Sequence, residues 1–82
     1  MKTYEKRPET ASVVCWGDEG CEADLAGALN PDQIREVDGF TLVAYEGDWR
    51  QLADGDRVIV SRGQARLVMG SADFDAAWRE VV

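Results

Sequence analysis

The sequence predicts an α+β domain: a small antiparallel β-meander of about four to five strands, with one or two short helices at 22–37 and a C-terminal helix at 72–80. Three observations predict this class. Short runs of β-formers recur between residues 40 and 69, separated by turns that contain glycine. The segment 22–37 combines helical spacing with a capping pattern, and the last twelve residues carry an apolar helical face.

The first expected strand is 12–16, which is short, apolar and rich in β-formers and is followed by a glycine-containing loop. The meander itself is predicted over 40–69 as one continuous antiparallel unit. Its strands are expected at 40–45, 49–52, 57–61 and 65–69. The turns between them are expected at Glu46-Gly47-Asp48, Asp54-Gly55 and Arg62-Gly63.

Two short helices are predicted between the first strand and the meander. Residues 22–29 have leucines four positions apart, which is the spacing of one helix face. A second helix is expected over 30–37, because Asn30 suits the N-cap, Pro31 the first helical position and Gln33 the reciprocal capping position. Its apolar residues would face the core, and the following Asp-Gly pair would end it.

The C-terminal segment is predicted to be an amphipathic helix that covers the meander. Ser71 can cap it, and acidic residues in its first turn suit the helix dipole. Its apolar face consists of Phe74, Ala77, Trp78 and Val81. We expect residues 1–82 to form a single domain, with only 1–9 flexible.

Charge is the most informative feature of the composition. The net charge is −7, and residues 17–38 carry seven acidic side chains against one arginine, a local charge of −6. A phosphate backbone would repel this chain, so no direct nucleic-acid binding is expected, and a protein partner with a basic surface is favoured instead. The alternative is that acidic charge only keeps a small domain soluble.

Several classes of function are disfavoured by missing residues. There is no histidine, no apolar run of about 20 residues and no secretory signal, so we expect no enzyme, no cofactor, no membrane span and a cytoplasmic location. Cys15 and Cys21 are predicted to be unpaired thiols. A disulfide across the loop is the alternative, and a metal site is disfavoured because zinc needs four ligands. A chain this short is also compatible with a homodimer.

The candidate partner-binding residues follow from the acidic segment and from one tryptophan. Trp16 and Trp78 are expected in the core. Trp49 is flanked by charged residues near a turn and is the best candidate for an interface anchor, with core packing as the favoured alternative for it. The full set is Asp18, Glu19, Glu22, Asp24, Asp32, Glu36, Asp38 and Trp49. No catalytic or metal-binding residue is predicted.

Short motifs spread along nearly the whole chain resemble a class of small phage-encoded proteins. They are Tyr4-x-Lys6-Arg7-Pro8, Trp16-Gly17-Asp18, Glu46-Gly47, Gly55-Asp56 before the apolar strand at 57–60, Arg62-Gly63, and Asp73-Phe74 through Val81-Val82. The chain departs from that class at Asp54, where proline is typical, and over 65–69, where an aromatic residue and prolines are typical. The resemblance implies a phage or prophage origin and assigns no functional residue.

These observations favour a small acidic phage protein that binds and inhibits or modulates a host protein. A nucleic-acid-binding defence effector of the CRISPR type is the specific hypothesis, because acidic groups could occupy its basic groove. One alternative is a homodimeric sponge for a nucleotide signal, suggested by Arg50, Arg57, Arg62 and Arg66. Another is a minor virion or assembly component.

Overall fold

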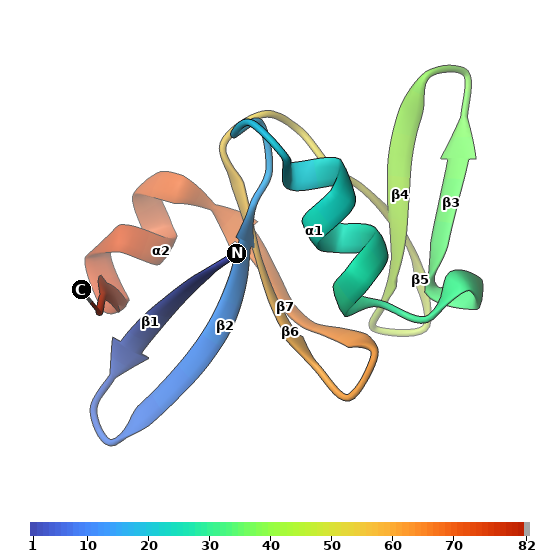
Figure 1. Cartoon of the computed structure of the whole chain (residues 1–82). Helices are drawn as coiled ribbons and strands as arrows, with labels where there is room; N and C mark the ends of the chain where they lie inside the picture. Colours follow the sequence, from blue (N-terminus) through green and yellow to red (C-terminus); the bar gives the residue numbers. More distant parts are fainter. Residues whose placement is uncertain (82) are drawn as a thin grey trace.

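The computed structural model describes residues 1–81, and over that range the chain forms eight strands, two short α-helices and one 3₁₀ turn (Figure 1). In chain order they are β1 (Lys2–Lys6), β2 (Glu9–Cys15), α1 (Cys21–Ala28), η1 (Pro31–Gln33), β3 (Ile34–Val37), β4 (Phe40–Tyr45), β5 (Asp48–Gln51), β6 (Asp56–Ser61), β7 (Gln64–Gly70), α2 (Ser71–Ala77) and β8 (Arg79–Glu80). The predicted α+β class is confirmed. Val82, which closes the last motif of the resemblance, lies outside the described residues.

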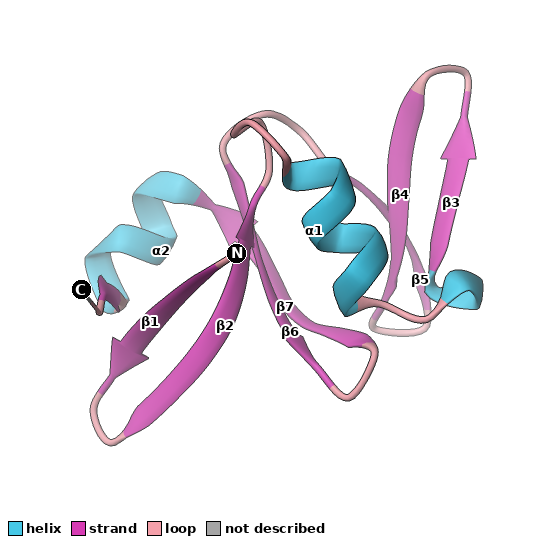
Figure 2. Cartoon of the chain, viewed as in Figure 1, coloured by secondary structure: helices cyan, strands magenta, loops and turns pink. Residues whose placement is uncertain are grey.

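The strands form two antiparallel sheets (Figure 2). The five-stranded sheet has the order β7-β6-β2-β1-β8, so the first and last strands of the chain lie side by side. The three-stranded sheet has the order β3-β4-β5. Its two turns are Asp38-Gly39 and Glu46-Gly47, in which both residues have positive φ, as tight two-residue hairpins require.

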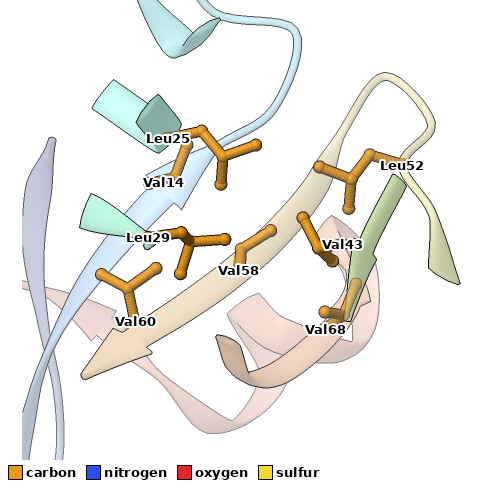
Figure 3. Close-up of a cluster of buried hydrophobic side chains, with 8 residues drawn as sticks. All are labelled: Val14, Leu25, Leu29, Val43, Leu52, Val58, Val60 and Val68. Carbon is orange, nitrogen blue, oxygen red and sulfur yellow. The ribbon is translucent and has the colours of Figure 1, made fainter. Parts of the chain in front are cut away.

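Each face of the five-stranded sheet is covered by a different layer. On one face, α1 and the three-stranded sheet enclose a cluster of buried aliphatic side chains, which Figure 3 shows. Its members are Val14, Leu25, Leu29, Val43, Leu52, Val58, Val60 and Val68. On the other face, Phe74 and Trp78 from α2 and its C-cap pack on Tyr4, Val13, Cys15 and Ile59. Phe74 contacts the Tyr4 ring edge-on at 4.8 Å and stacks on Trp78 at 5.7 Å between ring centroids.

The predicted second helix is wrong. Only Pro31–Gln33 is helical, as a single 3₁₀ turn, and Ile34–Val37 is the edge strand β3. The dipeptide Asp38-Gly39 makes the β3–β4 hairpin turn and does not end a helix. Alternation along β3 places Ile34 against the aliphatic cluster, whereas Val37 is exposed on the opposite face.

The meander is also not continuous. The strands of 40–51 belong to the three-stranded sheet, and β6 and β7 belong to the five-stranded one, so Asp54-Gly55 lies in the crossing between sheets. The N-terminal segment differs from the flexible one expected, because Lys2–Lys6 is β1 and Tyr4 is buried. The C-terminal helix is present but ends at Ala77; Trp78 is buried, as predicted, and Val81 is exposed.

Candidate functional site

A groove lies between α1 and the three-stranded sheet. Its main hollow, of about 650 Å³, is bounded by α1 on one side and by strands β3 and β4 on the other, with the segment after β5 at its end. The apolar part of its lining includes Trp16, Leu25, Ile34, Phe40 and Leu52. Because Leu25 and Leu52 belong to the buried aliphatic cluster, the base of the groove is fixed by the core of the protein.

A second hollow of about 600 Å³ adjoins the first and shares Trp16, Glu22 and Asp54 with it. The loop between β2 and α1 bounds it. Gly17 has φ +101 in this loop, and a Cβ there would lie 3.4 Å from the Cα of Asp54. This close approach brings the loop, which carries Asp18 and Glu19, against the end of the groove that Asp54 lines.

Trp16 is held where the two hollows meet. Its backbone N–H donates to the carbonyl of Asp56, and its carbonyl accepts from the N–H of Gly55, both at 2.8 Å. The side chain packs against the aliphatic cluster and is half-buried. The prediction that Trp16 lies within the core is therefore wrong, because this side chain lies at the edge of the core. The remaining indole surface faces the groove from both hollows.

The charged side chains lining the groove are all acidic. They are Asp18, Glu19, Glu22, Glu36 and Asp54, and no lysine or arginine of the described chain, residues 1–81, lies in either lining. Within residues 1–81, none of these five takes part in an ion pair. The groove therefore combines an apolar base with walls of uncompensated negative charge, an arrangement suited to a cationic side chain or a basic peptide.

The structure brings together four of the eight residues nominated from the sequence: Asp18, Glu19, Glu22 and Glu36. Asp24 instead binds the N-terminal ammonium of Met1 at 2.7 Å. Asp32 lies in η1, and Asp38 lies in the β3–β4 turn. The acidic segment is thus divided between the groove and other surfaces.

Trp49 lies outside the groove, on the outer face of the three-stranded sheet. The cross-strand pairs place Val37, Phe40, Leu42, Ala44 and Trp49 on this one face, which we call the outer apolar face. Val37 and Phe40 are 45% and 52% exposed, which is high for large apolar side chains. The Arg35 guanidinium covers Trp49 at 4.2 Å from the ring centroid. Phe40 also lines the groove, so the two surfaces meet there.

Besides Trp16, which was expected in the core, two groove residues were missed by the sequence analysis. Asp54 was read only as part of a hairpin dipeptide, and Phe40 only as the start of a strand. For Phe40 a signal existed: β4 alternates, and its partner Val37 across the Asp38-Gly39 turn is also apolar. For Asp54 no local signal existed, since its place depends on the crossing between sheets.

The cysteines lie on opposite faces of the five-stranded sheet. Cys15 is buried in the cluster under α2, whereas Cys21 packs against the aliphatic cluster, and both are free thiols. The Tyr4 hydroxyl is 3.7 Å from the Cys15 sulfur. Burial, and next this hydrogen bond, raise the pKa of Tyr4 from 10.0 to about 12. The fold therefore uses both thiols as packing groups.

The four arginines considered for a nucleotide site do not form one cluster. Arg50 is on the three-stranded sheet, and Arg57 faces the cluster under α2, on the same face as Cys15. Arg62 is in the β6–β7 turn, and Arg66 is on β7. Arg66 lines a third hollow, on the α2 side of the larger sheet.

Comparison of the chain with models of known protein families, with curated proteins and with solved structures finds no match to any of the three. Among the described residues, no helix is both long enough and apolar enough to cross a membrane.

Proposed function

We propose that this chain is a protein-binding module that takes a basic segment of its partner into the acidic groove. The observation that carries this proposal is the groove itself: five carboxylates, no lining cation and a partly open Trp16. An arginine or lysine entering it would meet negative charge on both walls and an indole on which its cation can stack.

The outer apolar face adds a second contact to the same partner. Taken alone it is small: β4 has six residues, so three strands cover very roughly 20 by 15 Å, or about 300 Å². A stable interface buries about 800 Å² on each side. A partner that spans the groove and crosses Phe40 onto this face would come closer to that area, with Trp49 as an anchor.

The resemblance of the sequence to small phage-encoded proteins directs the choice of partner. We propose a host protein, and specifically a defence effector whose nucleic-acid-binding surface is basic. Acidic side chains in the groove would compete with phosphate groups for that surface, and association would be fast and sensitive to salt.

The test compares two variants with the same change in charge. Glu22→Lys with Glu36→Lys reverses two groove carboxylates, and Asp32→Lys with Asp75→Lys reverses two exposed carboxylates elsewhere. A tagged wild-type chain is incubated with host lysate at low and high salt, the retained protein is identified by mass spectrometry, and its affinity for each variant is measured by calorimetry.

We expect the groove variant to lose about a hundredfold in affinity and the control less than about tenfold, because the control changes only the overall field. Equal losses of affinity in both variants would show that only net charge matters and would overturn the groove as the binding site. An unaltered affinity in the groove variant would do the same. A wild-type chain that retains no host protein at either salt concentration would refute the proposed function as a whole.

A further inference from the structure

The two long hairpins of the five-stranded sheet separate toward their turns. Strands β2 and β6 pair only over Ser12–Cys15 and Arg57–Val60, so the first three residues of β2 have no partner on that side. A hollow of about 640 Å³ lies in this fork. Its apolar lining includes Ala11, Leu67 and the largely buried Trp78, and its volume lies within the range of small-molecule sites.

A β-bulge places Arg66 at this fork. Ile59 pairs with Leu67 and Val60 with Ala65, so Arg66 is the extra residue of β7. Ala65 packs on the aliphatic cluster and Leu67 on the cluster under α2, so the strand changes face across Arg66. Bulges redirect side chains in this way, and here Arg66 and Leu67 both line the hollow.

The fork is a basic region on an acidic protein. Lys6 lines it from β1 and Arg66 from β7, and Arg7 and Arg62 lie in the turns that end the two hairpins. Within residues 1–81 none of these four cations is in an ion pair, whereas Lys2 and Arg79 each have a carboxylate partner. Among residues 1–81, Glu9 is the one carboxylate in the lining, so the lining itself carries +1. Arg7 and Arg62 in the two turns raise the charge around the fork to +3, on a chain of −7.

We propose that the fork binds a nucleotide, with its phosphate groups between Lys6 and Arg66. Arginine offers a planar array of donors to phosphate oxygens, lysine supplies a mobile point charge, and the hydroxyl of Ser61 in the lining adds a short donor. Glu9 would repel a bare phosphate, but it supplies the acceptor that a ribose hydroxyl or a base amino group needs. This site is distinct from the acidic groove and does not depend on it.

The experiment is a titration of the ¹⁵N-labelled chain with ATP, AMP and inorganic pyrophosphate, followed by backbone amide shifts at about 0.15 M salt. We expect ATP to shift amides of Thr10, Ala11 and Leu67, with a dissociation constant between about 1 μM and 1 mM. Lys6→Ala and Arg66→Ala should each weaken binding at least tenfold. Both side chains are exposed, so both variants should keep the wild-type spectrum away from the fork.

Arg50→Ala is the matched control, since Arg50 is also an exposed arginine, has no ion pair within residues 1–81 and lies on the other sheet. It should bind ATP as the wild type does, and Glu9→Gln should favour pyrophosphate relative to ATP. Absence of shifts with every probe, or equal weakening by Arg50→Ala and Arg66→Ala, would overturn the site. Pyrophosphate binding as tight as ATP binding in the wild type would overturn the assignment to a nucleotide.

Discussion

The aromatic cluster under α2 predicts a large loss of stability for Phe74→Ala. Phe74 is fully buried and makes two ring contacts, with Tyr4 and Trp78. Truncating a buried phenylalanine to alanine costs about 3–5 kcal/mol, of which two aromatic pairs account for about 1–3 kcal/mol. A chain of 82 residues has a total stability of about 4–12 kcal/mol. Phe74→Ala should therefore remove at least a quarter of it.

The assay is urea-induced unfolding, followed by far-UV circular dichroism and analysed by linear extrapolation. The chain has one other phenylalanine, Phe40, which is 52% exposed, and Phe40→Ala is the matched control. We expect it to cost less than about 1 kcal/mol. Phe74→Leu keeps most of the apolar volume but loses both ring contacts, so its cost in free energy of unfolding should lie between those of Phe40→Ala and Phe74→Ala. A cost for Phe40→Ala equal to that for Phe74→Ala would refute the packing of α2 described above.

Two further predictions concern the same cluster. The folded-state pKa of Tyr4 is about 12, above the value of 10.0 expected in the unfolded chain. This difference contributes about 2–3 kcal/mol to the free energy of unfolding. The contribution is complete below pH 10 and is lost as pH rises to 12. Urea unfolding at stepwise pH should show this loss in the wild type and not in Tyr4→Phe; identical profiles would contradict it. Cys21 should react with a thiol reagent in the folded protein much faster than the buried Cys15, and both should react after unfolding without reductant. A requirement for reductant would instead indicate the disulfide.

The sequence identified most elements correctly where hydrophobic pattern and turn residues agree. Strands β4, β6 and β7 are rich in β-formers and are joined or bounded by glycine turns, and α2 has an apolar face at helical spacing. These signals are local, so a single sequence contains them. Burial of Phe74 and Trp78 follows from the same helical spacing.

The error at β3 has a physical cause. Asn30, Pro31 and Gln33 do start a helical turn, but the Asn30 side chain makes no capping hydrogen bond, and the Asn30 backbone N–H donates to the carbonyl of Gly63. The chain extends from Ile34 onward. Four residues cannot sustain a helix without tertiary packing, whereas pairing with β4 satisfies the backbone. The Asp38-Gly39 pair was the available sign, since this dipeptide favours hairpin turns at least as strongly as helix ends.

The partition into two sheets could not be predicted from local pattern. Asp54-Gly55 is as typical of a hairpin as the three glycine-containing pairs that do form hairpin turns. These are Asp38-Gly39, Glu46-Gly47 and Arg62-Gly63. What prevents a β5–β6 hairpin is the competing pairing of β6 with β2, over forty residues away in sequence. A second long-range pairing, between β1 and β8, helps to make β1 an ordered strand, because β1 lies between β2 and β8 in the sheet.

The groove depends on this partition. If β5 and β6 were paired in one meander, Asp54 would lie at a hairpin tip, away from Trp16 and α1. The crossing instead carries Asp54 to the loop after β2, where Gly17 lets the two backbones approach. The density of acidic residues in 17–38 was visible in the sequence, but which of them share a wall was decided by strand pairing between distant segments. A test of the groove therefore has to reverse Glu22 and Glu36 and leave Asp32 in the control, although all three belong to the same acidic run.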